Sequence, residues 1–218
     1  MPRKPVETSS IFPYHIFARS NNKDWFSLDL EIIFFIYAEV LDKTTKRYGF
    51  LIHSFVLMSN HFHMMISTPE ANISKGMRYF MTETSRKIAR ESKRINRIYG
   101  ARYGSCIIKS SEHYAHAYKY VYRNPVEAKI CSKAEEYPWS SLSTDTIPIC
   151  SGINGFETHL PSNINDLISW VNQIEEKLFT EAIRLALYKR VFKITRNRKN
   201  SKMPVGTLAS TKKLDAGM

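Results

Sequence analysis

The sequence lacks a cysteine pattern and a long apolar run, and each absence excludes a class of protein. Its three cysteines, Cys106, Cys131 and Cys150, lie far apart and form no C-x-x-C pair, so neither a zinc knuckle nor a disulfide framework is expected. The longest apolar run, residues 32–37, is far too short to cross a bilayer. No apolar segment of the signal-peptide type follows the charged first residues. We therefore expect a soluble, cytoplasmic protein.

Acidic residues are also scarce relative to basic ones. The 218 residues contain 32 Lys and Arg against 20 Asp and Glu, a formal net charge of +12. A surplus of this size favours a polyanionic partner, such as nucleic acid or an anionic membrane surface. Charge alone leaves open a basic protein without such a partner. The apolar content, 43%, is that of a globular chain able to bury a core.

Hydrophobic periodicity predicts the element order β-α-β-β-α-β-α over the first two thirds of the chain. Strands are expected at 11–19, 50–57, 61–66 and 102–108, and helices at 29–48, 72–94 and 112–123. Pro125 should end the third helix, because the residue before a proline disfavours helical geometry. The simplest arrangement is an α+β, ferredoxin-like or RRM-like fold, in which two helices cover one face of a four-stranded antiparallel sheet.

The last third of the chain has a different composition. Residues 143–165 are polar and predict a linker or loop after a first domain at 1–142. Helical periodicity returns at 166 and continues to about 191, and residues 184–202 contain eight basic residues and no acidic one. We therefore expect a basic helical extension at 166–202, followed by a disordered tail at 203–218.

Two histidines flank a phenylalanine at the start of the third predicted strand, His61-Phe62-His63. Side chains alternate along a strand, so His61 and His63 project from one face of the sheet. Two neighbouring imidazoles provide half of a metal site. Taken alone, however, an H-x-H sequence is more often a pair of ordinary polar residues at a strand end.

The predicted helix at 112–123 is rich in tyrosine. Tyr120 and Asn124 are four residues apart and share one helix face, so they can address one site together. The remaining tyrosines are expected to pack the helix onto the sheet, a role that is also open to Tyr120. His116 shares the face of Tyr120 and is interpreted as a surface residue.

These motifs resemble those of a known family. Residues 58–66, MSNHFHMMI, resemble the M-P-N-H-x-H signature of the IS200-like transposases, with Ser59 in place of the usual proline. Residues 119–128 resemble the R-Y-I-x-x-N-P-V-x-A segment of the same family, with Lys119 for arginine and Val121 for isoleucine. An H-V-x-x-R-like strand at 14–19, an R-Y pair at 102–103 and a W-S-S box at 139–141 extend the resemblance over residues 10–142. Within the family, the chain is most similar to the transposases associated with repetitive extragenic palindromes (REP).

The resemblance implies a specific chemistry. Tyr120 would be the catalytic nucleophile, and His61, His63 and Asn124 would hold a divalent cation, Mg²⁺ or Mn²⁺. The expected enzyme nicks and joins single-stranded DNA at hairpin-flanked sites through a 5′-phosphotyrosine intermediate. Monomer and homodimer both remain open, since relatives of both kinds are known.

Several basic residues are expected to contact the single-stranded or hairpin DNA. They are Arg78, Arg86, Lys87, Arg102, Lys119, Arg190, Arg196 and Arg198. Two other functions remain possible at this point. One is a domesticated DNA-binding protein that keeps the fold without the reaction. The other is an RNA-binding RRM-like module, which would have aromatic residues on the exposed sheet face in place of the paired histidines.

Overall fold

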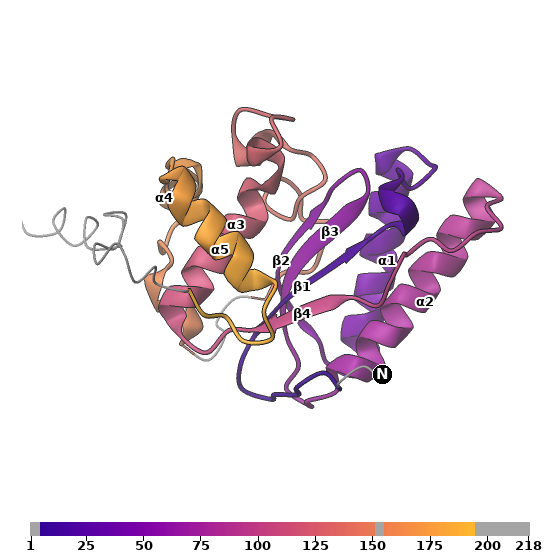
Figure 1. Cartoon of the computed structure of the whole chain (residues 1–218), viewed down its shortest axis with the longest axis horizontal. Helices are drawn as coiled ribbons and strands as arrows, with labels where there is room; N and C mark the ends of the chain where they lie inside the picture. Colours follow the sequence, from indigo (N-terminus) through magenta and orange to yellow (C-terminus); the bar gives the residue numbers. More distant parts are fainter. Residues whose placement is uncertain (1–4, 151–154, 195–218) are drawn as a thin grey trace, which may run out of the picture.

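A computed structural model describes residues 5–150 and 155–194 of the chain. Four antiparallel strands form one sheet of order β2-β3-β1-β4, which is the predicted ferredoxin-like order (Figure 1). The strands are β1 (Tyr14–Arg19), β2 (Leu51–Leu57), β3 (His61–Ser67) and β4 (Gly104–Ile107). The helices are α1 (Leu30–Tyr48), α2 (Ile73–Ser92), α3 (Ser111–Glu127), α4 (Ile164–Asn172) and α5 (Lys177–Leu187). Short 3₁₀ turns lie at Asn21–Lys23, Ala134–Glu136 and Phe156–His159.

The helices α1 and α2 cover one face of the sheet, as predicted (Figure 1). On α1, Ile33, Tyr37 and Val40 are fully buried at helical spacing. The helix ends at Gly49, whose φ of 64° is a left-handed conformation that glycine adopts without strain. Every second residue of the central strands, such as Ile16 of β1, enters this core.

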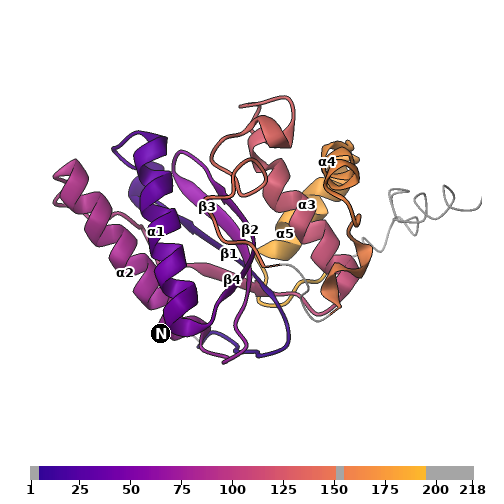
Figure 2. The ribbon, with the colours of Figure 1, turned by 180° about the vertical axis from the view of Figure 1, so that it is seen from behind.

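The opposite face of the sheet is covered as well, by α3 and α5, and α4 packs on α3 (Figure 2). Met65 of β3 and Cys106 of β4 pack there against Tyr114 and Val121 of α3. Ile183 of α5 belongs to the same core. Alternation along the strands therefore supplies apolar side chains to both faces, and the C-terminal helices share a hydrophobic core with the first 142 residues.

The predicted end of the third helix is wrong, because α3 continues through Pro125 to Glu127. Pro125 has no N–H to donate to the carbonyl of Val121, one turn earlier. The side-chain amide nitrogen of Asn124 donates to that carbonyl at 3.3 Å, and to the carbonyl of Tyr120 at 2.8 Å. The asparagine thus replaces the missing backbone donor, which allows the helix to pass the proline.

Both edges of the sheet are protected by later segments of the chain. The backbone of the W-S-S box pairs with β2, through Leu57 N to Trp139 O and Ser141 N to Phe55 O, each 2.9 Å. At the other edge, Ile107 of β4 exchanges 2.8 Å hydrogen bonds with the segment after α5. Covered edges of this kind prevent pairing with other chains.

The C-terminal extension differs in detail from the prediction. The periodicity from 166 to about 191 corresponds to two helices, because the backbone leaves helical geometry at Gln173 and again at Glu176. The tail at 203–218 lies outside the described residues. Within 5–150 and 155–194, no helix is long and apolar enough to cross a membrane.

Candidate active site

The candidate site lies on the α3 side of the sheet, where β1 and β3 leave the cover of the helices. In the antiparallel register, Phe17 lies opposite His63 and Arg19 lies opposite His61. Paired residues of neighbouring strands point to the same face, so these four side chains share one surface. The predicted placement of the two imidazoles side by side is confirmed, with ring centroids 5.1 Å apart.

His61 is oriented by its neighbour in the β2–β3 turn. Its Nδ1 lies 2.7 Å from Oδ1 of Asn60, an oxygen that can only accept, so Nδ1 carries the proton. Nε2 is left with a lone pair. Burial lowers the pKa of His61 to about 4, and the nearby Arg19 acts in the same direction. The imidazole is therefore neutral at neutral pH, which is the form that binds a metal.

His63 is oriented by a residue that the site prediction omitted, His15 of β1. Nδ1 of His63 lies 2.9 Å from Nε2 of His15, and the two rings are stacked. Burial lowers the pKa of His63 well below its ordinary value, and burial lowers that of His15 to about 3. When His63 donates this hydrogen bond, its Nε2 is free. The first position of the H-V-x-x-R-like strand was the sequence signal for His15.

Tyr120 lies over this histidine group. Its ring centroid is 5.7 Å from that of His63 and 6.1 Å from that of His15, and the ring is nearly perpendicular to both. Burial raises the pKa of Tyr120, which Arg184 and Arg19 oppose only in part. The phenol is therefore protonated at neutral pH.

The accessibility of α3 singles out the two predicted residues. From Tyr114 to Pro125 every residue is buried except Tyr120 and Asn124, which are only partly buried. The other tyrosines of this stretch pack in the core: Tyr114 bonds to His53 at 3.0 Å, and Tyr122 bonds to Ser141 at 2.9 Å. The amide nitrogen of Asn124 is occupied by backbone carbonyls, so its Oδ1 is the atom left for another partner.

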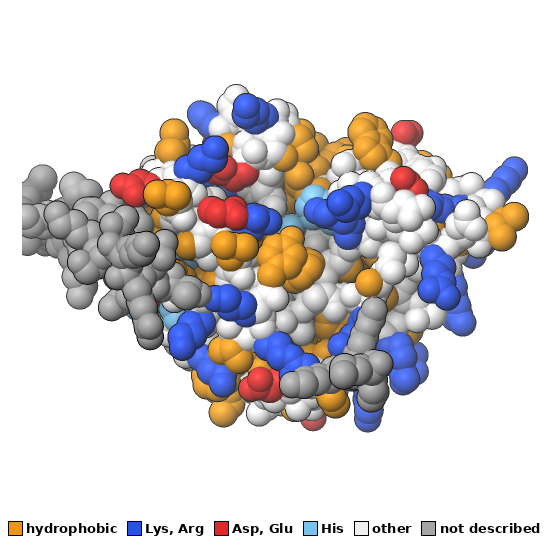
Figure 3. All heavy atoms as spheres, in the orientation of Figure 1, with side chains coloured by type: hydrophobic (Ala, Val, Ile, Leu, Met, Phe, Trp, Pro, Cys, Tyr) orange, Lys and Arg blue, Asp and Glu red, His pale blue; other side chains and the backbone are white. Residues whose placement is uncertain are grey.

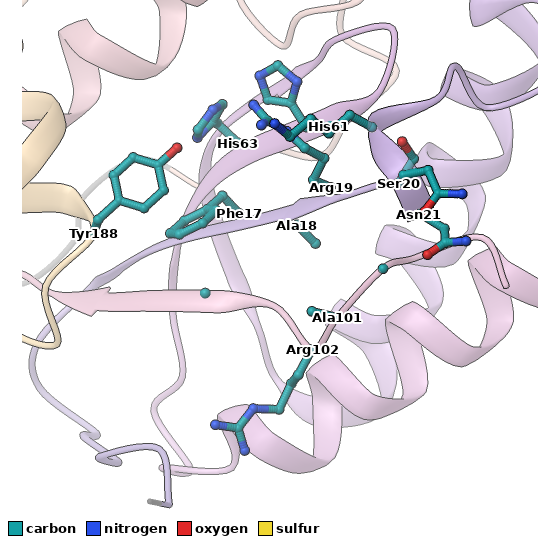
Figure 4. A pocket seen from close by; sticks show the side chains of 14 residues that line it. Phe17, Ala18, Arg19, Ser20, Asn21, His61, His63, Ala101, Arg102 and Tyr188 are labelled. Atoms are coloured by element: carbon teal, nitrogen blue, oxygen red, sulfur yellow. The ribbon is translucent and has the colours of Figure 1, made fainter. Parts of the chain in front are cut away.

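A cavity of about 520 Å³ opens beside the imidazoles. His61 and His63 line it together with Phe17 and Arg19 of β1, and Figure 4 shows these side chains around one space. In the space-filling view, histidine atoms are visible near the middle of this face, beside Lys, Arg and apolar side chains (Figure 3). The volume falls in the range of roughly 300–1,000 Å³ that is typical of ligand sites.

Comparison with known proteins identifies the family of the chain. The model of the family described as "Transposase IS200 like" matches residues 10–124, more than half of the chain. The chain belongs to this family. Family membership implies a transposase that cleaves DNA, and the matched range contains both histidines, Tyr120 and Asn124.

One solved structure has a fold similar to that of this transposase. A REP-associated tyrosine transposase bound to a REP hairpin superposes with a TM-score of 0.56 at 16% identity, covering 71% of this chain and 93% of that one. A second structure, a candidate transposase from Deinococcus radiodurans, gives a TM-score of 0.38 at 14% identity, with 60% and 94% covered. No curated protein matches the sequence.

The basic residues predicted to contact DNA are distributed unevenly around the transposase. Arg102 lines the cavity, and Arg190 is exposed at the edge of β4. Arg78, Arg86 and Lys87 lie on α2, behind the sheet, where Arg86 pairs with Glu83 and Lys87 with Glu39 at 2.9 Å each. These three do not reach the site. Arg196 and Arg198 lie outside the described residues.

Two expectations for side chains on α3 are corrected by the packing of the C-terminal helices. Lys119, predicted to contact DNA, is buried, paired with Glu175 at 3.1 Å and placed over the ring of Trp170. His116, predicted to lie on the surface, is buried against Phe179 of α5. Both positions would be exposed on an isolated α3. In the folded chain, α4, α5 and the turn between these helices cover both side chains.

Proposed function

We propose that this transposase is a metal-dependent endonuclease and strand transferase that acts on single-stranded DNA at hairpin-flanked sites. In this proposal Tyr120 is the nucleophile and forms a 5′-phosphotyrosine link. The observation that carries it is the position of the Tyr120 ring, 5.7 Å from that of His63, on an otherwise buried stretch of α3. A structural tyrosine would be buried like its neighbours at 114, 118 and 122.

The donor set fits a divalent cation. Within the described residues no group of three His, Cys, Asp or Glu side chains is arranged to hold a metal ion. In this proposal the protein ligands would be His61, His63 and Asn124, completed by water and phosphate oxygen. Each imidazole is neutral and has its Nδ1 held by a neighbouring side chain, Asn60 or His15. Histidines that bind metals are typically oriented by such a hydrogen bond to their other ring nitrogen. A bound Mg²⁺ or Mn²⁺ would neutralise charge that develops on the scissile phosphate.

The protein's own groups would carry the remaining chemistry. The Tyr120 oxygen forms a bond to phosphorus while the bond between phosphorus and the 3′ oxygen breaks. The phenol gives its proton to solvent, and the leaving 3′ oxygen takes up a proton from solvent to become a hydroxyl. The raised pKa of Tyr120 means that the phenol needs help to ionise. Arg19 and Arg184 favour the phenolate electrostatically. Attack by another 3′ hydroxyl on the phosphotyrosine reverses the step and joins strands.

The positions of the charged groups agree with a single-stranded substrate. Arg19 and Arg102 line the cavity beside the imidazoles, where they can contact successive phosphates. A solved structure of the same fold was determined with a REP hairpin, which supports a hairpin as the neighbouring element. Because Tyr120 and His63 of one chain are already adjacent, we propose that one copy contains a complete site.

The test is a covalent adduct. The full-length protein is incubated with Mn²⁺ and hairpin-bearing single-stranded DNA from the region that flanks its gene, and is then denatured. We expect a protein–DNA adduct that disappears in Tyr120→Phe and with EDTA, and persists in Tyr118→Phe, a matched variant at a buried tyrosine of the same helix.

Three outcomes would contradict the proposal. An adduct that persists in Tyr120→Phe would assign the nucleophile to another residue. Tight DNA binding without any adduct would favour the non-catalytic DNA-binding protein, and preferential binding of RNA would favour the RRM-like module.

A further inference from the structure

The cavity beside the imidazoles has an aromatic wall that the proposed reaction does not use. Phe17 of β1 and Tyr188, which follows α5, meet with ring centroids 4.7 Å apart at an interplanar angle of 66°. Tyr188 is 51% exposed, although its ring is large and apolar. Figure 4 shows both rings at the same side of the space that His61 and His63 border. Tyr188 lies outside the residues matched by the family model.

The backbone of β4 is shaped to accommodate this wall. Gly104 lies opposite Phe17 in the sheet, and a Cβ on Gly104 would come within 2.2 Å of Cζ of the Phe17 ring. Only glycine lets the ring lie across β4 in this way. Glycine in a strand often marks such a close approach.

The charges around the aromatic wall are those of a polyanion site. Of the described residues that line the cavity, Arg19, Lys23 and Arg102 are cationic and none is acidic. A second hollow of about 190 Å³ continues past Tyr188 and includes Arg190 and one carboxylate, Glu7, which is paired with Lys109 at 3.7 Å. The two hollows share Arg102, Gly104 and Tyr188, so the tyrosine ring stands between two parts of one basic groove.

We propose that Tyr188 and Phe17 form a stacking site for one unpaired nucleobase of the DNA strand that passes the imidazoles, while Arg19 and Arg102 hold its phosphates. Placing this base next to the cleaved phosphate rests on the proposed function. Aromatic side chains spaced along a basic groove bind single strands without sequence preference, because every base has a π-face. A paired base within a duplex cannot present that face. The site therefore selects unpaired DNA.

The simpler explanation is that Tyr188 only anchors the segment after α5. That segment is already held by two backbone hydrogen bonds. The N–H of Ile107 donates to the carbonyl of Arg190, and the N–H of Phe192 donates to the carbonyl of Ile107. Phe192 itself is buried, with an exposed fraction of 3%. An anchoring role would not require half of the Tyr188 surface to remain accessible.

The experiment separates base contacts from phosphate contacts. The full-length protein is titrated with an oligothymidylate and with an abasic oligonucleotide of the same length, and the ratio of the two Kd values is measured. Stacking on an aromatic side chain should make wild-type binding of the thymidine strand roughly 5- to 150-fold tighter. Tyr188→Ala should reduce this ratio, and Tyr188→Phe, which keeps the ring, should preserve it. Arg102→Gln should weaken both ligands equally.

Two results would overturn the stacking site: a wild-type ratio of one, or a ratio that is the same in Tyr188→Ala as in the wild type. A wild-type protein titrated with an oligothymidylate that contains 2-aminopurine provides a check without mutation, since stacking quenches its fluorescence. Absence of quenching at saturation would refute the site even if Tyr188→Ala fails to fold.

This outcome is independent of the adduct assay. If the Kd ratio responds to Tyr188 but no adduct forms, the stacking site stands and the nuclease proposal fails. If the adduct forms and the ratio does not respond, only the stacking site fails.

Discussion

Asn124 and Pro125 provide a test that separates a structural role from a ligand role in one residue. The side-chain amide of Asn124 donates to the carbonyls of Tyr120 and Val121. The Val121 carbonyl has no backbone donor one turn later, because Pro125 has no N–H. A net hydrogen bond is worth about 0.5–1.5 kcal/mol, and a buried carbonyl left unpaired costs about 1–3 kcal/mol. Asn124→Ala should therefore lower the free energy of unfolding by about 1–2 kcal/mol.

The cost should depend on the proline. In a Pro125→Ala background the backbone N–H of residue 125 can donate to Val121, so the same Asn124→Ala change should cost about 1 kcal/mol less. Urea unfolding of the four proteins, with equal m-values, measures this coupling as a double-mutant cycle. Equal costs of Asn124→Ala in both backgrounds would refute the account of how α3 passes the proline.

Ion binding should follow a different pattern in the same variants. Asn124→Asp cannot donate to the carbonyls but keeps an oxygen for a cation, so it should lose stability and retain Mn²⁺ binding. Asn124→Ala with Pro125→Ala should recover stability without recovering Mn²⁺ binding. Calorimetric titration with Mn²⁺ distinguishes the two. If the alanine pair binds Mn²⁺ as the wild type does, Asn124 is not a ligand.

Three further changes test the surroundings of the site. Burial lowers the pKa of His53 to about 3. When the pH falls below about 6.5, the usual pKa of histidine, only the unfolded chain takes up a proton at this residue. Stability should then fall from pH 7 to pH 5, and His53→Asn should reduce the loss by about 2 kcal/mol in urea unfolding; an unchanged loss would contradict the shift. His15→Ala should weaken Mn²⁺ binding by roughly 10- to 100-fold, because His63 loses its orienting partner, and calorimetry showing full affinity would exclude that role. Gly104→Ala should cost roughly 1–3 kcal/mol with Phe17 present and little in a Phe17→Ala background, since the added Cβ meets that ring; equal costs in both backgrounds, measured by unfolding, would contradict the contact.

The local patterns of the sequence determined much of the fold and of the candidate site. Alternation along a strand places His61 and His63 on one face, and four-residue spacing places Tyr120 and Asn124 on one helix face. These are properties of neighbouring residues, so they were readable before any tertiary contact was known. The same holds for the approximate positions of the strands and of α1 and α2, and for the left-handed end of α1 at Gly49. It does not hold for the end of α3 or for the break between α4 and α5.

Tertiary structure alone decided which of the remaining residues reach the site. His15 is brought beside His63 by strand pairing between residues 48 positions apart, and Lys119 is removed from solvent by Glu175 and Trp170. The basic residues of α2 lie behind the sheet because that helix packs on the other face. Burial and pairing between distant segments depend on how the layers stack, and no local spacing encodes that.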